Sequence, residues 1–322
     1  MILVVGDYIV DEYIHGTVTR ISPEAPVPIL NYGKTERRPG GAGNVHNNLL
    51  TLGKKSLLVG VTGPGPVVKP GDAFLFVDPN RITTIKTRIL AENGQQMMRI
   101  DHEHCNPIDE NVAKILIEFV ELNKRVIDLI IISDYNKGTI TPMVARSLIT
   151  FADTLGVPVI VDSKRKDWRM FSGAWLATPN SDEYEAASGL QELLLTGTNI
   201  LVTLGAQGAR LHKAPQGACQ PLATSGNPSP KMPATEQPGA ATMTLTAPLT
   251  MGLTPPLLIP AQAQEVSDVT GAGDTVVAAM ASYIADHGLS DLEGAAHWAM
   301  RAAAIAVSKH GTATVSDREM FR

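Results

Sequence analysis

The sequence contains few cysteines and has no excess of positive charge. Its 322 residues include only two cysteines, Cys105 and Cys219, which are too far apart to form a ligand-spaced pair. A disulfide framework is therefore not expected, and a reducing compartment fits the composition. Lysine and arginine total 27 against 32 aspartates and glutamates, giving a net charge of −5. This balance argues against a nucleic acid partner, so any anionic ligand must be held by a few local groups.

Long hydrophobic runs are also missing. The most apolar later stretch, 126–132, is short and is interrupted by Asp128, so no segment is expected to span a membrane. The chain opens with an apolar run at 2–5, which is typical of a buried strand and lacks the basic start of a secretory signal. We therefore expect a cytoplasmic protein with no membrane partner.

Short β-branched runs alternate with amphipathic segments along the chain. Strands are predicted at 2–5, 56–61, 129–132, 157–161 and 200–204, and helices at 44–52, 111–122 and 141–155. Gly53 and Gly156 follow two of these helices, as helix-ending glycines do. Continuous apolar strands separated by helices predict an α/β fold with three α/β/α layers and a mostly parallel central sheet. Ligands in such folds bind beyond the carboxyl ends of the strands.

Three segments depart from this alternation. Residues of about 8–35 and 81–101 read as extended, and an Asn-Gly pair at 93–94 predicts a hairpin in the second of them. These segments could form a small β lid over the main domain, or a peripheral hairpin without a role. Residues of about 214–262 hold ten of the 22 prolines, no aromatic residue and two charges. We interpret them as a low-complexity loop insertion.

The most informative string is "DVTGAGDT" at 268–275, where glycines and an aspartate precede a run of small apolar residues. A helix starting there would present the amides of Gly271, Ala272 and Gly273 to an anion, since glycine permits close approach and a helix N-terminus carries partial positive charge. Asp274 would lie in the first turn. Taken alone, the string is better explained by a plain helix cap at Asp274 or Thr270.

Two other nucleotide-binding motifs are excluded. A dinucleotide-binding fingerprint requires a third glycine where Val276 stands, and it should follow the first strand. The complete Walker pattern, Gly-x4-Gly-Lys-Ser/Thr, does not occur anywhere in the chain.

Further strings shift the interpretation from a cap to a phosphate site. "RPGGAGNV" (38–45) is a second glycine-rich helix entry, "TPNSDEYE" (178–185) sets an asparagine and a glutamate three apart, and "VTLGAQGARL" (202–211) is a strand that ends at glycines. Together with "DVTGAGDT", these strings resemble the ribokinase-like (PfkB) family of carbohydrate kinases. Within that family, "RISPEAPVP" (20–28), "ERRPGGAGNV" (36–45) and "SDYNKG" (133–138) resemble the kinases of D-glycero-β-D-manno-heptose 7-phosphate.

The resemblance implies an enzyme, and a single ribokinase-like kinase domain over 1–322. Its activity would be ATP-dependent phosphorylation of the anomeric O1 of the heptose 7-phosphate, a step toward ADP-heptose and the lipopolysaccharide core. Bifunctional members of the group add a nucleotidyltransferase domain, and we expect only the kinase half here. Two alternatives stay open: a kinase for a different sugar or sugar phosphate, and a non-catalytic sensor of sugar phosphate or nucleotide.

The resemblance also assigns catalytic and metal roles. Asp274 would accept the proton of the attacking sugar hydroxyl, while the amides of 271–273 stabilise the transferred phosphoryl group. Asn180 and Glu183 would organise Mg²⁺ through water, with a capped helix start as the structural alternative. Asp268 matches a position that holds a monovalent cation such as K⁺ in several relatives, and a plain turn aspartate explains it equally well.

The remaining site residues are also carried over from the family. The sugar contacts implied are Asp11, Gly40, Gly41 and Asn44, and the cations for the sugar's phosphate are Lys86, Arg88, Arg99 and Lys137. The nucleotide contacts implied, besides Asn180, are Lys164, Thr203, Gly205 and Gly208. Residues 309–315 are expected on the adenine side, and the lid strands are expected to join two chains into a homodimer. The sequence departs from the family pattern after "VGVTG" (59–63) and after Glu185, where relatives have longer helical segments.

Overall fold

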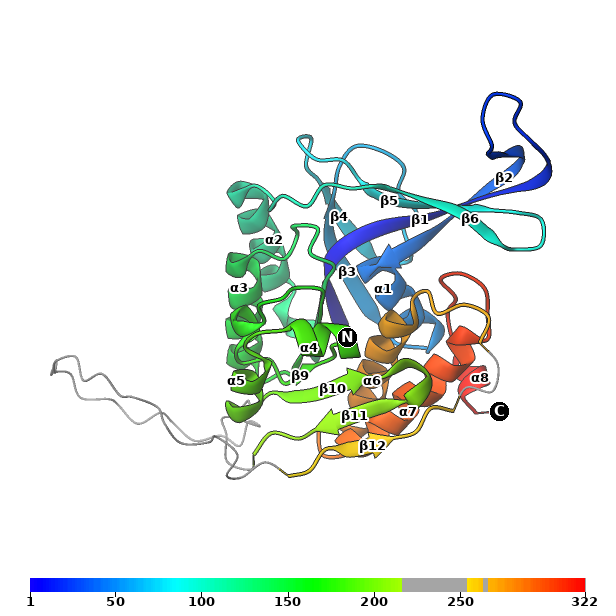
Figure 1. The fold of residues 1–322 in the computed structure, drawn as a ribbon. Helices are drawn as coiled ribbons and strands as arrows, with labels where there is room; N and C mark the ends of the chain where they lie inside the picture. The colour runs from blue at the N-terminus through cyan, green and yellow to red at the C-terminus, as the bar shows by residue number, and fades with distance from the viewer. Residues whose placement is uncertain (216–253, 263–265, 322) are drawn as a thin grey trace, which may run out of the picture.

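The computed structural model describes residues 1–215, 254–262 and 266–321. Its central sheet is mostly parallel (Figure 1). The strands of this sheet are β1 (Ile2–Ile21), β3 (Ser56–Thr62), β4 (Ala73–Val77), β7 (Leu129–Asp134), β8 (Val159–Ser163), β9 (Leu176–Ala177), β10 (Asn199–Thr203), β11 (Ala209–His212) and β12 (Leu257–Ile259). They lie in the order β12-β11-β10-β9-β8-β7-β1-β3-β4, and β11 is antiparallel to both of its neighbours.

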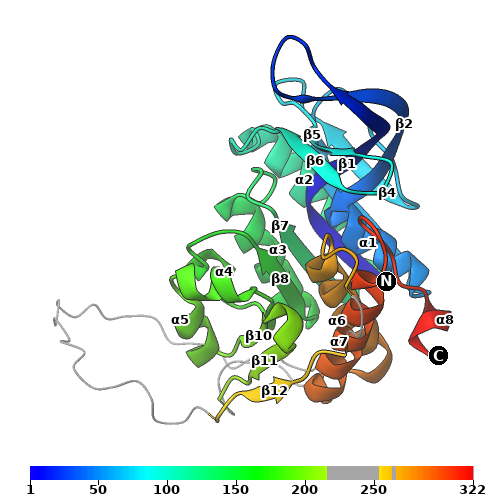
Figure 2. The same ribbon diagram turned by 45° about the vertical axis from the view of Figure 1, so that its right-hand side comes forward.

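Helices cover both faces of the sheet, which gives the three layers expected from the sequence (Figures 1 and 2). One face is covered by α1 (Ala42–Thr51), α6 (Ala272–His287) and α7 (Leu292–Val307), and the other by α2 (Glu110–Leu122), α3 (Pro142–Leu155) and α5 (Leu190–Leu195). Shorter elements are α4 (Ser181–Ala186), α8 (Asp317–Met320) and the 3-10 turns η1 (Lys124–Val126), η2 (Arg169–Phe171) and η3 (Gly205–Gln207).

The apolar start of the chain explains why the sheet is buried on both sides. Side chains alternate across a strand, so Ile2 and Val4 pack with α1, α6 and α7, whereas Leu3 and Val5 pack with α2 and α3. All four side chains are at most 2% exposed. A strand buried on two faces needs a continuous apolar run, which is the pattern that the sequence shows.

A small β lid projects beyond the carboxyl edge of the central sheet (Figures 1 and 2). Its strands are β2 (Pro28–Gly41), the far half of β1, β5 (Thr84–Leu90) and β6 (Gln96–His102), paired in that order. The hairpin predicted at 93–94 is the turn between β5 and β6. The lid is confirmed, but 8–35 is not a separate segment, because β1 is one strand shared by the lid and the central sheet.

The low-complexity insertion ends earlier than the composition predicted. Residues 257–259, which fell inside the predicted loop of 214–262, form β12, and Ile259 is fully buried against the core. Residues 216–253 lie outside the described part of the chain. Between β3 and β4 the described residues contain no helix, which agrees with the short segment noted in the sequence. Among the described helices, none combines the length and the hydropathy that crossing a membrane requires.

Candidate active site

Asp274 lies in the first turn of α6 but does not cap it. The helix is preceded by Gly271, which has φ 78° and makes no side-chain cap bond. Asp274 is 2% exposed, and both of its carboxylate oxygens accept hydrogen bonds from distant segments rather than from its own helix. The simple helix-cap explanation of the glycine–aspartate turn is therefore wrong for Asp274.

Two donors hold the Asp274 carboxylate in place. Asn44 Nδ2, in α1, donates to Oδ2 at 2.8 Å, and the Tyr135 hydroxyl, just after β7, donates to Oδ1 at 2.7 Å. Burial raises the pKa of Asp274 to about 7, while these two hydrogen bonds and the charge of Lys164 oppose that rise. A carboxyl group with a pKa near neutrality, at the edge of a cavity, is suited to accept a proton.

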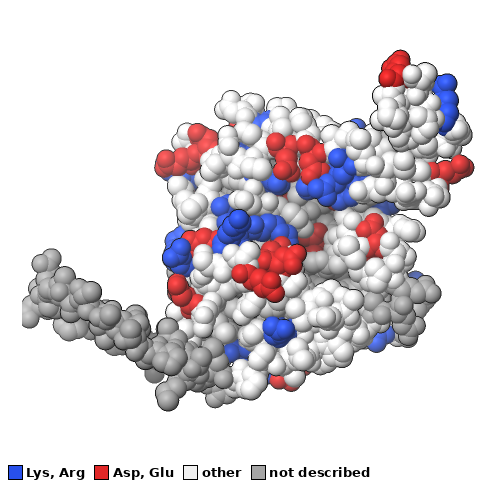
Figure 3. All heavy atoms as spheres, in the orientation of Figure 1, with Lys and Arg blue, Asp and Glu red and all other residues white. Residues whose placement is uncertain are grey.

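A cavity of about 170 Å³ lies between Asp274 and the lid. In the space-filling view, acidic and basic side chains border a hollow beneath the lid (Figure 3). The cavity gathers seven of the residues that the resemblance implied: Asp11, Gly41, Lys86, Arg88, Arg99, Gly271 and Asp274. Residues from β1, β2, β5, β6 and α6, far apart in the chain, thus meet at one place at the carboxyl edge of the sheet.

Asp11 and Arg88 form a buried ion pair on one wall of this cavity. Arg88 Nη1 lies 2.6 Å from Asp11 Oδ1, and the two side chains are only 10% and 5% exposed. Burial raises the pKa of Asp11 and the Arg88 charge opposes that rise. Gly40 lies directly against this carboxylate, because a Cβ at Gly40 would stand 2.3 Å from Asp11 Oδ2. Glycine is required here for close approach, as the sequence suggested.

The other cations predicted for the sugar's phosphate are already paired with carboxylates. Lys86 Nζ lies 3.3 Å from Asp101 and 3.5 Å from Glu103, and Arg99 Nε lies 2.9 Å from Asp101. Lys137 Nζ lies 2.9 Å from Glu103, and Lys137 is outside the lining of the cavity. Arg88 and Arg99 together with Lys86 thus face the cavity, whereas the structure does not bring Lys137 to it.

Asn180 and Glu183 form the capped helix start that was the structural alternative. The Asn180 side chain accepts from the Glu183 amide at 2.8 Å, and Glu183 Oε2 accepts from the Asn180 amide at 2.9 Å. Glu183 Oε1 lies 2.7 Å from Lys164 Nζ. Within the described ranges, no three His, Cys, Asp or Glu side chains gather closely enough to hold a metal ion. These residues fit a contact with Mg²⁺ through water and do not fit direct ligation.

Asp268 also has a structural role. Its Oδ1 accepts from the Thr270 amide at 2.8 Å and its Oδ2 from the Gly311 amide at 2.9 Å, so it joins the turn before α6 to the 309–315 segment. The expected place of 309–315 on the adenine side stays a prediction, because the residues of this segment that line a cavity lie elsewhere. Gly311 and Thr312 line the lid side of the site, and Thr312 N donates to the Tyr13 hydroxyl at 3.0 Å.

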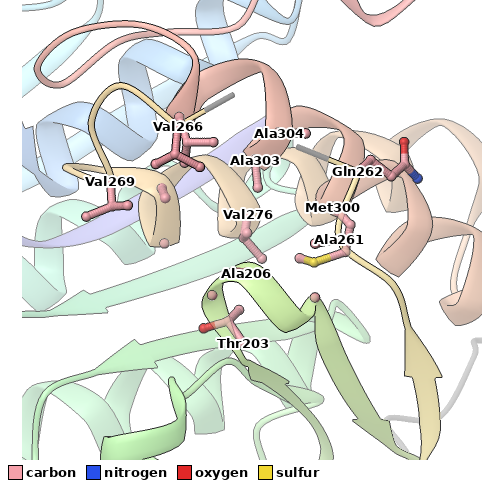
Figure 4. Close-up of a pocket in the computed structure, with 15 residues that line it drawn as sticks. Thr203, Ala206, Ala261, Gln262, Val266, Val269, Val276, Met300, Ala303 and Ala304 are labelled. Atoms are coloured by element: carbon pink, nitrogen blue, oxygen red, sulfur yellow. The ribbon is translucent and has the colours of Figure 1, made fainter. Parts of the chain in front are cut away.

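A second, mainly apolar cavity of about 270 Å³ lies on the other side of the α6 N-terminus (Figure 4). Three residues that were predicted to contact the nucleotide line this cavity: Thr203, Gly205 and Gly208. They come from the end of β10 and the turn that follows it. Figure 4 shows Val276 and Met300 directed toward Thr203 and Ala206 across the cavity. Its apolar walls suit the flat base of a nucleotide.

Comparisons with known proteins show which sequences and structures the chain is similar to. A model of the pfkB family carbohydrate kinases matches residues 256–319, the segment that contains Asp274. A curated protein named bifunctional protein HldE, from Gluconacetobacter diazotrophicus, is 37% identical over 330 residues, which cover 99% of this chain and 63% of the relative. The chain carries a pfkB-family carbohydrate kinase domain. Another bifunctional protein HldE, from Caulobacter vibrioides, is also 37% identical, over 99% of this chain and 62% of the relative.

The kinase domain thus spans less than two thirds of the length of these curated relatives. Solved structures share its fold. Arabidopsis thaliana ribokinase, complexed with ribose and ATP, matches 99% of this chain and 97% of its own with a TM-score of 0.64 and 18% identity. Phosphofructokinase-2 from Escherichia coli, in complex with potassium, matches 100% and 96% with a TM-score of 0.69 and 18% identity. Likeness at this identity shows a ribokinase-like fold alone.

Sequence reasoning missed one residue of the kinase domain that touches Asp274. Tyr135 lies in "SDYNKG", a string that contributed to the resemblance, but no role was attached to its hydroxyl. Its position directly after a buried parallel strand was the available signal, because that is where such sheets place their ligand-facing residues. Asn44 was expected to contact the sugar, which stays a prediction, and the structure places its amide on Asp274.

Gly271→Ala in the kinase domain is expected to reduce kcat by at least tenfold. The new Cβ would stand 2.6 Å from Asn44 Nδ2, and the positive φ of 78° is unfavourable for alanine. Backbone strain of about 1–2 kcal/mol would be added to the displacement of a donor from Asp274. The measurement is steady-state kinetics alongside thermal unfolding. Gly288→Ala, with a similar φ of 79° and open space at its Cβ position, is the control and is expected to affect stability but not kcat.

Proposed function

We propose that the chain is an ATP-dependent kinase that phosphorylates the anomeric O1 of D-glycero-β-D-manno-heptose 7-phosphate. In this reaction the sugar O1 forms a bond to the γ-phosphorus of ATP, and the bond from that phosphorus to the bridging oxygen of ADP breaks. The proton of the sugar hydroxyl passes to Asp274. The products are the heptose 1,7-bisphosphate and ADP.

One observation carries this proposal: both cavities border the start of α6. Gly271 and Asp274 line the cavity under the lid, and Ala272 and Gly273 line the apolar cavity on the other side. A sugar in the first and a nucleotide in the second would bring the acceptor hydroxyl and the terminal phosphate together at Asp274. Such positioning supplies much of the rate in phosphoryl transfer.

The start of α6 supplies partial positive charge to the transferred group. Among the described residues, no carbonyl accepts a bond from the Gly271 or Gly273 amide, whereas the Ala272 amide donates to Val269 O at 3.2 Å. We therefore assign the contact with the phosphoryl group to Gly271 and Gly273 and not to Ala272. Unpaired amides at a helix N-terminus favour an anion, and the charge that spreads during transfer strengthens these bonds.

Mg²⁺ is the divalent cation that we propose for the nucleotide phosphates. A hydrated Mg²⁺ neutralises phosphate charge, and the Glu183 carboxylate and Asn180 amide would reach its water shell from the start of α4. Lys164 holds Glu183 in place at 2.7 Å. A monovalent cation near Asp268 remains a proposal by resemblance, and both of the Asp268 oxygens already accept amide bonds.

The choice of a phosphorylated sugar is supported by the charge at the lid. Lys86, Arg88 and Arg99 line the cavity, and the more exposed Arg99, at 51%, could turn toward a phosphate. Arginine and lysine both hold phosphate well. The choice of a heptose rests on the strings that resemble the heptose 7-phosphate kinases and on the match to bifunctional HldE proteins.

A coupled assay for ADP release tests the proposal directly. The purified chain would be offered heptose 7-phosphate, fructose 6-phosphate, ribose and unphosphorylated heptose, each with ATP and Mg²⁺. The proposed function requires heptose 7-phosphate to give a kcat/KM at least a hundredfold above the others. Higher turnover of another sugar would support a different ribokinase-like kinase. Ligand-induced thermal shifts without turnover of any sugar would support a sensor.

The pH dependence of the reaction is expected to follow Asp274. Burial raises the pKa of this carboxyl to about 7, so the proton-accepting carboxylate becomes the minority form below that pH. We expect kcat/KM to level off above pH 8 and to fall about tenfold per unit at pH well below 7. A profile that stays flat from pH 8 down to pH 5 would contradict this role for Asp274.

We also propose a homodimer formed through the lid strands. β6 is an edge strand, and its Met98 and Ile100 are 59% and 50% exposed. A long exposed edge with apolar side chains favours pairing with another strand. A single kinase domain over 1–322, acting in the cytoplasm, is part of the same proposal.

A further inference from the structure

Tyr135 is held in a firmly anchored turn at the carboxyl end of β7. Asp7 accepts from the amides of Lys137 and Thr139, each at 2.9 Å, and Asp134 accepts from the amide of Asn136 at 2.9 Å. Arg81 adds a hydrogen bond to the carbonyl of Lys137. These bonds hold the backbone that carries the Tyr135 side chain.

The hydroxyl of Tyr135 lies at the centre of the candidate site. It donates to Asp274 Oδ1 at 2.7 Å, and the ring lines the cavity under the lid. Lys164 Nζ lies 5.6 Å from the centre of the ring, on the side where Lys164 also contacts Glu183. The tyrosine therefore contacts Asp274 and lies close to the charged cluster at the start of α4.

The donor on each oxygen of Asp274 has a chemical consequence. A carboxylate oxygen has two acceptor positions, so each oxygen of Asp274 can accept from Asn44 or Tyr135 and still accept from a sugar hydroxyl. Both bonds favour the ionised form over the neutral form. Without them, a carboxyl group that is 2% exposed would stay protonated at neutral pH and could not take a proton.

We propose that Tyr135 is a positioning residue for the phosphoryl-transfer reaction, whose hydroxyl stabilises the ionised form of Asp274 and fixes the direction of its free acceptor position toward the sugar. This inference rests on the proposed function. In this inference Tyr135 does not contact the nucleotide. Loss of its hydroxyl therefore affects turnover and the pH dependence of turnover, and leaves nucleotide binding unchanged.

Tyr135→Phe tests this role. Loss of one hydrogen bond to an ionised group is expected to raise the pKa of Asp274 by about one unit, which moves the acid limb of the kcat/KM profile up by the same amount. At pH 6 the variant is expected to show about tenfold lower kcat/KM than the unmodified chain, with an unchanged Kd for ATP. Titration of Asp274 by carbon-13 NMR of labelled aspartate measures the same shift without turnover.

Tyr8→Phe is the matched control. The Tyr8 hydroxyl accepts from the Val68 amide at 3.1 Å, away from Asp274, so its removal is expected to lower stability without moving the acid limb. If Tyr135→Phe does not fold, 3,5-difluorotyrosine at position 135 keeps the ring and gives a stronger donor, and it is expected to move the limb to lower pH.

The outcomes separate the inference from the proposed function. A shifted carboxyl titration supports the role of Tyr135 even if no sugar is turned over, and absence of turnover then counts against the proposed function alone. An unchanged titration of Asp274 in Tyr135→Phe, or no downward shift with difluorotyrosine, would overturn the inference even in a fully active kinase.

Discussion

Asp274→Asn is expected to lower kcat by about two to four orders of magnitude, the scale of losing a general base. Asparagine keeps the size of the side chain and can still accept a hydrogen bond, but its amide cannot take the proton of the sugar hydroxyl. The Kd for ATP is expected to stay within about threefold, because Asp274 lines the cavity under the lid and not the apolar one. Single-turnover kinetics and equilibrium nucleotide binding measure the two quantities separately.

Asp317→Asn provides the control for this substitution. Asp317 is also an acidic residue in the first turn of a helix, α8, and it is exposed. It should leave kcat unchanged, since a first-turn acid by itself adds only a small favourable interaction with the helix dipole. A kcat for Asp274→Asn equal to that of Asp317→Asn would remove the proton-accepting role from Asp274.

Arg88→Met is the second substitution with a large expected effect. It would leave Asp11 buried without its cation, and breaking a buried pair in this way costs about 3–5 kcal/mol of the free energy of unfolding. The pKa of Asp11, already raised by burial, would rise further. We expect kcat/KM for the sugar phosphate to fall at least a hundredfold, because the cavity loses both a cation and an ionised hydrogen-bond acceptor.

Arg37→Met is the matched control for Arg88. Arg37 Nε lies 2.6 Å from Glu12, but Arg37 is 45% exposed and outside the cavity lining. Because the arginine of this pair is half exposed, its contribution should be close to that of a surface pair, about 0–1 kcal/mol, so both stability and kcat/KM should stay close to those of the unmodified chain. Chemical unfolding and sugar-phosphate kinetics on the two variants give the comparison. Equal effects of the two substitutions would show that the Asp11–Arg88 pair has no special place in the site.

Short sequence patterns predicted the parts of the fold and the site that depend on neighbouring residues. Continuous apolar runs predicted the buried parallel strands, and the glycine–aspartate turn predicted the start of α6. The Asn-Gly pair predicted the β5–β6 hairpin because few residues adopt that turn. Each of these features depends on residues that are close in the chain, so the sequence shows all the groups involved.

Contacts between segments that are distant in the chain could not be predicted from the sequence. Asn44 and Tyr135 bind Asp274 across 230 and 139 residues, and only the packing of α1 and β7 against α6 brings them together. The sequence also did not show that β1 continues from the central sheet into the lid. This strand pairs with β3 in its first part and with β2 further along, and both partners are distant segments.

One contact within the lid could have been predicted from the strand pattern. In the β5–β6 register, Lys86 pairs with Asp101 and Arg88 with Arg99. Residues directly opposite on two paired strands share a face, so the ion pair between Lys86 and Asp101 follows once the hairpin is accepted. By contrast, the compositional bias of 214–262 hid the three-residue strand β12, since Leu257 to Ile259 are too few to show a period.

A crystal structure with a non-hydrolysable ATP analogue and a sugar phosphate tests the central claim most directly. The account predicts that the terminal phosphate contacts the amides of Gly271 and Gly273, that the acceptor hydroxyl lies within hydrogen-bond distance of the Asp274 carboxylate, and that the base occupies the apolar cavity beside Val276. A terminal phosphate bound away from the α6 N-terminus, with Asp274 still bonded only to Asn44 and Tyr135, would contradict it.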